Sequence, residues 1–332
     1  MATNEIGTAS STGVRAHRVH SDPARSDLRP SDLLGLLHLG ILVAVTGAGL
    51  RLSAGFGVLG WAVGQGLVAV ALVQWFILLH EAGHMTLFRG RTLNILAGHL
   101  ASVFALVPFA SWRRIHGLHH VWTGWQDKDP TTASLTPRHR SRSERAVVDI
   151  AWRCWLPLFS VVYRLGNYWN LPRLWTQFPS RRQRIGIVLN AGLLLAMYGA
   201  MGLYVGWANA VSLFGLALLV GLALQDPLIL SQHTHIPQPV SGGRRVAPLT
   251  AREQLPYTRS LRFPSWFARW VLLNFNAHEL HHLHAGVPGY RLMLLDEQQA
   301  NEVHWWQWLK AAKRLRGSDF VFGNRTQTGF KL

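Results

Sequence analysis

Four long apolar segments restrict this chain more than any other feature. Each is about long enough to cross the ~30 Å hydrocarbon core of a bilayer at about 1.5 Å per helical residue. They come in two pairs, and a very short loop joins the members of each pair. The sequence therefore predicts an all-α integral membrane protein built on two helical hairpins. The four predicted transmembrane helices cover residues 33–50, 56–79, 185–205 and 208–230.

The composition supports this fold class and limits the chemistry. Hydrophobic residues make up 49% of the 332 residues and charged residues only 15%, whereas soluble domains carry about 25% charged residues. The single cysteine, Cys154, excludes an intrachain disulfide framework, a four-cysteine zinc site and a cysteine-ligated iron–sulfur cluster. Any metal site must therefore use histidine and carboxylate ligands, and the chain contains 17 histidines.

The rest of the chain divides into weaker segments. Residues 93–110 and 147–169 are apolar but interrupted by polar side chains and proline. We expect them to form helices that lie in the membrane interface, with two further spans as the alternative. Residues 1–30 are polar and lack the apolar run of a secretory signal, which predicts a disordered N-terminal tail. We expect a membrane domain over residues 31–310 and a C-terminal tail over residues 311–332.

The charge distribution predicts how the hairpins are oriented. The chain has a net charge of +17, with 33 Lys and Arg against 16 Asp and Glu. The two hairpin loops contain one basic residue, Arg51, and all the others lie on the opposite side or in interfacial segments. The positive-inside rule then places both termini and the long segments in the cytoplasm. This accounts for the charge without nucleic acid, for which the chain has no recognisable motif.

Most histidines fall in four short clusters. The first is an H-x3-H, the second and fourth are H-x2-HH, and the third is a Gln-His-Thr-His. All four follow apolar spans or lie in predicted cytoplasmic segments, so they share one side of the membrane. In order, they contain His80 and His84; His116, His119 and His120; His233 and His235; and His278, His281 and His282.

The spacing within the clusters suits two metal ions. Residues four apart on a helix lie on one face, so His80 and His84 can reach one ion together. In H-x2-HH, the first histidine neighbours both later ones, which diverge by about 100° around the helix axis. One of these can share an ion with the first histidine while the other reaches a second ion. Six isolated histidines are interpreted as incidental: His17, His20, His38, His99, His139 and His304.

The ligand type alone leaves the metal open, because so many imidazoles suit Zn, Cu, Ni or Fe. A hydrolytic zinc site needs only three ligands and an open position, so this number of ligands favours two metals. A dimetal site at a membrane surface suits the activation of O2 against an unactivated lipid chain. Two other classes are alternatives: a hydrolytic metalloenzyme, and a histidine-rich metal transporter or receptor. The transporter would place ligands inside the spans, whereas these histidines cap the spans at one face.

In these motifs the chain resembles the membrane fatty acid desaturase and hydroxylase superfamily, over roughly residues 33–300. The match rests on an H-x3-H and two H-x2-HH boxes, in that order, around two hydrophobic hairpins. The chain is more specifically similar to bacterial and plastid-type acyl-lipid desaturases in its wider motifs. These are Trp112-Arg113-Arg114-Ile115-His116, Asp127-Lys128-Asp129-Pro130, Gln232-His233-Thr234-His235-Ile236-Pro237, and His281-His282-Leu283-His284 with Pro288 and Tyr290.

The resemblance implies two non-haem iron ions in a cytoplasmic helical cap, with O2 as co-substrate. A ninth ligand is expected after the fourth span, with His233 as first choice and His235 as second. Four further residues are candidates to orient the imidazoles through their other nitrogen, with a solvated or capping role as the alternative: Glu81, Asp127, Asp129 and Asn276. Carried over by position, the other ligands are His80, His84, His116, His119, His120, His278, His281 and His282.

The activity that the resemblance implies is O2-dependent desaturation of fatty acyl chains that are linked to membrane lipids, with a narrow apolar channel to hold the chain. A hydroxylase or ketolase acting on alkyl chains or carotenoids is the alternative within the superfamily. The electrons would come from an external donor, ferredoxin-like or cytochrome-type, since the chain shows no fused redox domain. The charge bias and the lack of an organelle signal fit a bacterial inner membrane with a cytoplasmic active site. The oligomeric state is left open.

Overall fold

The computed structural model describes residues 27–136 and 140–332. Four of the described helices are long and apolar enough to cross a membrane, and they coincide with the four predicted spans. The mostly helical fold is therefore confirmed, and the chain is an integral membrane protein. The four helices are α1 (Asp32–Gly55), α2 (Gly57–His84), α8 (Arg181–Val205) and α9 (Trp207–His233).

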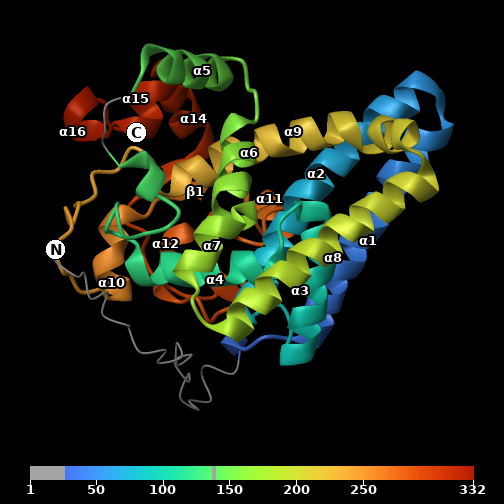
Figure 1. Ribbon diagram of the computed structural model, residues 1–332, viewed down its shortest axis with the longest axis horizontal. Coiled ribbons are helices and arrows are strands. Elements are labelled where there is room, and N and C mark those ends of the chain that lie inside the picture. The colour runs from blue at the N-terminus through green and yellow to red at the C-terminus, as the bar shows by residue number, and fades with distance from the viewer. Residues whose placement is uncertain (1–26, 137–139) are drawn as a thin grey trace.

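The two hairpin turns lie at the same end of the molecule, at the upper right of Figure 1. Side chains near the turns join the hairpins: the Trp61 Nε1–H donates to Ser212 O over 2.9 Å, and the Gln65 amide donates to Leu213 O over 2.8 Å. Helix α2 is the buried centre of the molecule. In its most apolar 18-residue stretch 72% of the residues are buried, compared with 28% in α1, 22% in α8 and 33% in α9. The other three helices therefore present most of their apolar surface to lipid.

Two bent helix pairs stand where we expected interfacial helices. The first pair bends by 99° and the second by 119°, and the chain would have six spans if each pair counted as one. Pro108 and Pro157 lack the N–H that would continue a helix through each break. Leu106 and Trp155 turn the chain there, with φ of 56° and 58°. The pairs are α3 (Arg91–Ala105) with α4 (Phe109–Trp122), and α5 (Arg142–Arg153) with α6 (Leu158–Arg164) and the π-helix η3 (Leu165–Trp169).

The remaining elements form a cap at the end opposite the hairpin turns, on the left of Figure 1. Two three-residue parallel strands in this cap are an addition to the predicted all-α fold. The cap elements are η2 (Ala133–Leu135), α7 (Leu171–Gln177), α10 (Ala251–Gln254), η4 (Leu255–Tyr257), β1 (Ser260–Arg262), α11 (Ser265–Trp270), α12 (His278–Leu283), α13 (Gly289–Leu292), β2 (Glu302–His304), α14 (Trp305–Arg314), α15 (Gly317–Phe322) and α16 (Arg325–Thr328).

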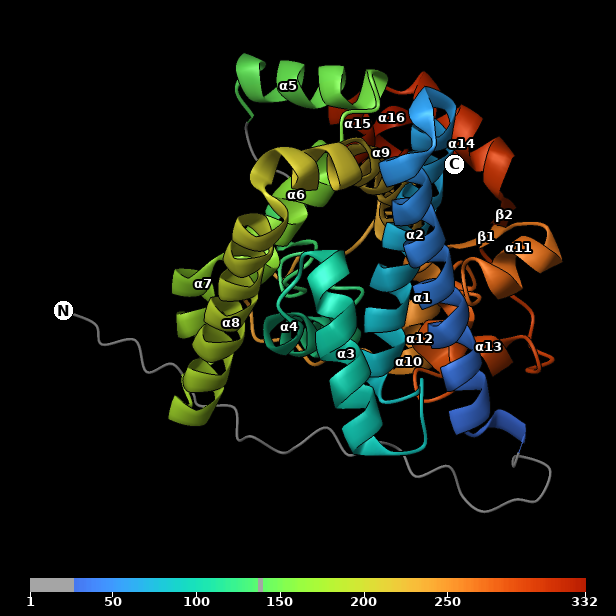
Figure 2. The same cartoon turned by 90° about the vertical axis from the view of Figure 1, so that its right-hand side faces the viewer.

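The residues that we expected to form a C-terminal tail pack into the cap instead. Helix α14 continues to Arg314, and α15 lies beside α5, as Figure 2 shows. Phe320 of α15 is fully buried and stacks on Trp152 with ring centroids 4.7 Å apart. The physical reason is apolar burial against a helix that is distant in sequence. The predicted N-terminal tail, apart from residues 27–30, lies outside the described residues, as do His17, His20 and His139.

Candidate metal centre

Nine histidines converge where α2 and α9 end, next to α4 and α12. Helix α2 ends at His84 and helix α9 at His233. Immediately before α12, Leu273 and Asn274 adopt left-handed conformations with φ of 47° and 55°. The Asn274 Nδ2–H holds this turn by donating to Gly289 O over 2.8 Å. Strained non-glycine residues of this kind cluster at functional sites, and here the turn sets the start of the third box helix.

The first set of histidines, called group one, consists of His80, His84, His116, His120 and His281. One ring nitrogen from each of His80, His84, His116 and His281 lies within 4.8 Å of the others. His84 Nε2 is 2.8 Å from His116 Nε2. His120 joins the group because its Nε2 is 3.1 Å from Nε2 of both His116 and His281. Five imidazoles from three helices thus point their nitrogens at one small volume.

The second set, called group two, consists of His119, His233, His278 and His282. Their nitrogens also lie within 4.8 Å of one another. His278 Nε2 is 2.8 Å from His233 Nε2 and 3.1 Å from His282 Nε2. The groups adjoin, since the rings of His120 and His282 stack with centroids 4.4 Å apart. The arrangement could therefore hold two neighbouring metal ions.

The two H-x2-HH boxes divide between the groups in opposite ways. On α4, His116 and His120 are four apart and both face group one, while His119 faces group two. On α12, His278 and His282 are four apart and both face group two, whereas the intervening His281 faces group one. Each box therefore serves both groups, as the 100° divergence of adjacent helical residues predicts.

The chemistry of the ring nitrogens in group two fits a cation. In three of its rings, Nδ1 faces an oxygen that can only accept a hydrogen bond, so Nδ1 must carry the single proton of a neutral imidazole. The Nε2 lone pairs of these rings then converge, which is repulsive unless a positive ion lies among them. The three contacts are His119 Nδ1 to Asp129 Oδ2 (2.7 Å), His233 Nδ1 to Tyr257 O (2.9 Å) and His282 Nδ1 to Gln254 Oε1 (3.0 Å).

Burial keeps the imidazoles of the third box neutral. Loss of solvation lowers the pKa values of His278, His281 and His282 well below the ordinary value for histidine. The surrounding imidazoles lower these pKa values further. Burial alone would raise the pKa of Asp129, but the contact with His119 and the Thr131 N–H lower it overall. Neutral imidazoles beside an ionised carboxylate are the protonation states that metal binding requires.

Two of the four candidate orienting residues contact histidines. Asp129 accepts from His119, as given above, and Glu81 Oε1 lies 3.4 Å from His80 Nδ1 while its other oxygen accepts from the Gly289 N–H. Asp127 instead caps a turn, accepting from the Ser241 N–H over 2.8 Å. Asn276 donates to the Leu261 carbonyl over 2.7 Å. Among the described residues, neither of these last two side chains is hydrogen-bonded to a histidine.

Sequence reasoning missed two partners of group two, Gln254 and the Tyr257 carbonyl. Gln254 also donates to the carbonyls of His120 and Leu249, so it ties α10 to both the second and third boxes. Its local sequence shows only a helix cap, formed by Thr250 and Glu253. No spacing rule connects this segment to histidines that far away in the chain, so the sequence held no signal for the contact.

His235, the second choice for the ninth ligand, lies outside both groups. Its Nε2 is 2.9 Å from Thr328 Oγ1, and its backbone pairs with that of Asn324. His235 therefore faces the C-terminal segment and not the other histidines of group two. A left-handed backbone with φ of 64° directs it there. The isolated histidines in the described chain also stay apart: His38 stacks on Tyr290, His99 faces Asn190 and His304 caps α14.

A close contact between α2 and α4 positions the first two boxes. Trp112 is buried and its ring stacks on His116, with centroids 4.4 Å apart and planes 20° apart. The Trp112 ring lies against Gly83, where any Cβ would collide with it. The small residue between His80 and His84 therefore allows the two helices to approach closely enough for their histidines to meet.

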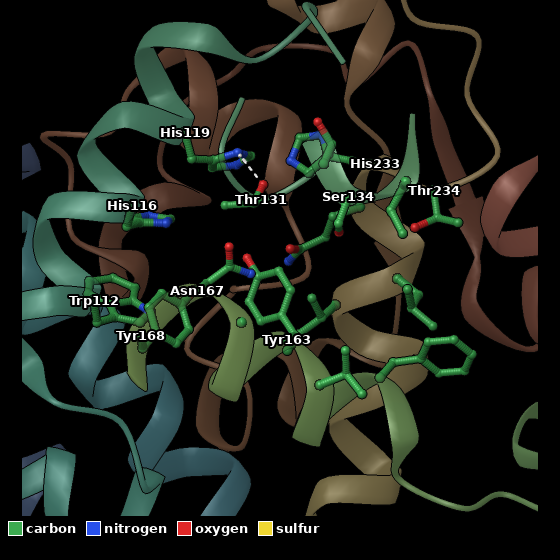
Figure 3. Close-up of a pocket in the computed structure, with 18 of the residues that line it drawn as sticks. Trp112, His116, His119, Thr131, Ser134, Tyr163, Asn167, Tyr168, His233 and Thr234 are labelled. Atoms are coloured by element: carbon green, nitrogen blue, oxygen red, sulfur yellow. Dashed lines mark hydrogen bonds between the residues drawn. The ribbon is translucent and has the colours of Figure 1, made fainter. Parts of the chain in front are cut away.

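A cavity of about 200 Å³ adjoins both groups. Its wall includes His116, His119 and His233, and Figure 3 shows them on one side of the cavity with Tyr163 and Asn167 facing them. Most of the remaining wall is apolar or aromatic. A chain-like apolar ligand in this cavity would lie directly against the histidine rings. The apolar and aromatic wall includes Phe76, Trp112, Leu135, Phe159, Val162, Tyr168, Ile229, Leu230, Phe275 and Val321.

Comparison with known proteins places the same residues in one family. A model of the family described as fatty acid desaturase matches residues 57–310. The chain is 27% identical over 240 residues to the sn-1 oleoyl-lipid 12-desaturase of Picosynechococcus sp., covering 68% of this chain and 65% of that protein. It is 24% identical over 242 residues to a fatty acid desaturase of Bacillus subtilis, covering 70% and 66%. The chain thus matches just under two thirds of these relatives' lengths.

A shorter alignment reaches higher identity. Over 112 residues the chain is 35% identical to a Delta(12) fatty acid desaturase of Caenorhabditis elegans, covering 32% of this chain and 29% of that protein. The family model is the broader finding, because it spans most of the chain and includes every histidine of both groups. On that basis the chain belongs to the fatty acid desaturase family.

Proposed function

We propose that this protein is an O2-dependent desaturase of fatty acyl chains with two iron ions. The observation that carries the proposal is the pair of converging histidine groups beside a mostly apolar cavity. Group one would hold one ion and group two the other, with His233 rather than His235 as the ninth ligand. Membership of the desaturase family supports iron as the metal and an acyl chain as the substrate.

The bound irons would supply the oxidising power, reducing O2 with electrons from outside the chain. Overall, two hydrogens leave adjacent methylenes, and O2 takes up two electrons and two further protons to give two waters. The protein's own part is positioning: the walls around Phe76, Phe159 and Leu230 hold the chain and exclude water. Trp112 and Tyr168, which are almost fully buried, limit the space beside the histidines.

We propose a lipid-linked acyl chain as the substrate. Support comes from the cavity, which is bounded by α2, α6 and α9, so an acyl chain can reach it from the membrane. Val162 on its wall is 57% exposed, which supports an opening on the α6 side. One of the relatives carries the name sn-1 oleoyl-lipid 12-desaturase, which agrees with a lipid carrier.

The electrons require a separate donor, ferredoxin-like or cytochrome-type. Near group two, Arg244, Arg245 and Arg252 are exposed on and just before α10, whose Gln254 contacts His282, together with the exposed Glu253. Such a surface attracts an acidic redox protein and increases its association rate. The hairpin turns lie together and carry only Arg51, so the positive-inside rule supports a cytoplasmic cap, in a bacterial inner membrane.

The test is a fatty acid profile by gas chromatography–mass spectrometry. Cells express the unaltered chain, His281→Ala, or the control His284→Ala, all with a compatible electron donor. His284 follows the same box but pairs with Glu297 at 2.7 Å on the surface. We expect new unsaturated chains with the unaltered protein and the control only. Hydroxylated chains would instead indicate a hydroxylase, and unchanged acyl chains in iron-loaded protein with a competent donor would contradict an acyl substrate.

Metal analysis of the same purified proteins tests the cofactor separately. We expect iron in the unaltered protein and in His284→Ala, and less iron in His281→Ala. A full complement of zinc with the activity intact would contradict the assignment of iron.

A further inference from the structure

A second cavity, of about 520 Å³, lies on the other side of α9 from the histidines. This volume falls within the roughly 300–1,000 Å³ of small-molecule sites. We call it the lateral groove, and its lining is almost wholly apolar. The lining residues are Val70, Val73, Trp155, Leu224, Pro227, Leu228, Leu261, Phe263, Pro264, Trp266, Phe267, Val271, Leu272, Trp305, Trp308 and Leu309.

The lateral groove is separate from the cavity beside the histidines. The two have no lining residue in common. The last turns of α9 form the wall between them: Leu224 and Leu228 line the groove, while Ile229 and Leu230 line the histidine cavity. A molecule in the groove would therefore not occupy the substrate position.

The lateral groove is open to the membrane. Val70 and Val73 of α2 and Leu224 of α9 bring two transmembrane helices to its wall. Trp155 and Trp266 at its margin are 44% and 64% exposed. Tryptophan is enriched at the level of lipid headgroups, so this margin is placed where the apolar and polar parts of a lipid meet.

A cation without a carboxylate partner lies at one end of the groove. Trp305, Leu309 and Lys313 follow one another on a single face of α14, and the first two line the groove. Lys313 Nζ is 4.0 Å from the ring centroids of both Trp152 and Trp155, and it donates a hydrogen bond to the Trp152 carbonyl. Within the described parts of the chain, no carboxylate oxygen lies within 4.0 Å of it. Burial lowers the pKa of Lys313 to about 8, because desolvation disfavours the charged ammonium more than Asp226 favours it.

The groove also has a donor with no acceptor. Trp308 is 1% exposed and lines the groove, and its indole nitrogen, which neighbouring atoms cover, has no hydrogen-bond partner among the described residues. Leaving a buried donor unpaired is costly, so such groups are normally satisfied. Lys313 thus has no carboxylate partner and the Trp308 N–H has no acceptor among the described residues, beside an apolar groove.

We propose that the lateral groove binds one phospholipid with an anionic headgroup, distinct from the substrate. An acyl chain would lie along Leu224, Leu228 and Phe267, and the oxygens of the headgroup would meet Lys313. Anionic phospholipid combines the required apolar chain, negative charge and acceptor oxygens in one molecule, and it is present in the bilayer that surrounds α2 and α9. Its contacts with α9 would support the helix that ends at His233.

Native mass spectrometry of the detergent-purified full chain tests the proposal, with phosphatidylglycerol and phosphatidylcholine as the two probes. We expect one tightly bound phosphatidylglycerol per chain and weaker binding of phosphatidylcholine. Lys313→Gln should weaken phosphatidylglycerol binding about fivefold, the factor for one basic residue near an anionic surface. The matched control is Lys310→Gln, because Lys310 lies over Trp306, which is not part of the groove lining.

Two further variants test the apolar part and the unpaired donor. Leu228→Trp, which fills the groove, should weaken binding of both lipids, and Trp308→Phe, which keeps a ring but removes the N–H, should weaken both less. Metal content should be unchanged in the Lys313 and Trp308 variants, which shows that the fold and the histidine groups persist. Equal binding of the two lipids to the unaltered chain, or equal effects of the Lys310 and Lys313 changes, would overturn the proposal. No outcome depends on desaturase turnover.

Discussion

Groups one and two contain the same chemical groups but are held in place differently. In group two, three rings are fixed through Nδ1 by Asp129, Tyr257 O and Gln254, at distances of 2.7–3.0 Å. In group one, the described chain shows a contact through Nδ1 for His80, whose Nδ1 lies 3.4 Å from Glu81 Oε1. This distance is longer than any of the three in group two. Group one depends on helix packing instead, because α2 is the buried centre of the molecule.

Helices α4 and α12 contribute to both groups, so the difference lies in the remaining elements, α2 for group one and the end of α9 for group two. His80 and His84 lie on a long helix whose position is set by packing over its whole length. His233 lies at the end of α9, and His278 and His282 lie on a six-residue helix that also carries His281 of group one. Hydrogen bonds through Nδ1 define the ring orientation in group two, whereas the packing of a long helix defines the backbone position of His80 and His84 in group one.

Loss of one ligand should have the largest effect. We expect His84→Ala and His233→Ala each to abolish desaturation, since each removes a ligand from a different ion. If the groups bind separate ions, the metal content should fall from about two ions per chain to about one in each variant. Metal analysis of the purified variants checks this, with His284→Ala as control. Retention of both ions in either variant would contradict the division into two groups.

Loss of an orienting carboxylate should have an intermediate effect that differs between the groups. Asp129→Asn should lower metal affinity about 10- to 100-fold, the usual effect of removing a partner of a ligand imidazole. Glu81→Gln should lower it less, because its contact with His80 is longer and α2 holds the ring independently. Competition against a chelator measures both. Asp127→Asn is the control, since Asp127 caps a turn two residues from Asp129. An equal effect of the Glu81 and Asp129 changes would remove the distinction.

The smallest effect should come from His235, which lies two residues from a proposed ligand but outside both groups. His235→Ala should leave metal content and desaturation unchanged. It should lower the free energy of unfolding by about 1 kcal/mol, for the lost hydrogen bond to Thr328. Thermal denaturation and metal analysis together check this. Loss of metal in this variant would return His235 to the ligand set.

Local patterns in the sequence predicted the features that depend on local geometry. The four apolar segments predicted α1, α2, α8 and α9, because a span is defined by its length and apolar character alone. The H-x2-HH spacing predicted that each box would reach two ions, because the angle between neighbouring residues is a property of the helix itself. The candidates Glu81 and Asp129 also lie within or close to the boxes they contact.

Features that join distant segments were decided only by the tertiary structure. Whether His233 or His235 joins group two depends on one left-handed residue and on how α16 packs. Gln254 contacts His282, and Phe320 is buried against Trp152. In each case two segments meet that are distant in the chain, and no periodic pattern in the sequence relates them. The lateral groove arises from α2, α9, α11 and α14 together. Helix formation and membrane insertion are determined over a few turns of chain, whereas side-chain contacts between elements are determined by the packing of the whole molecule.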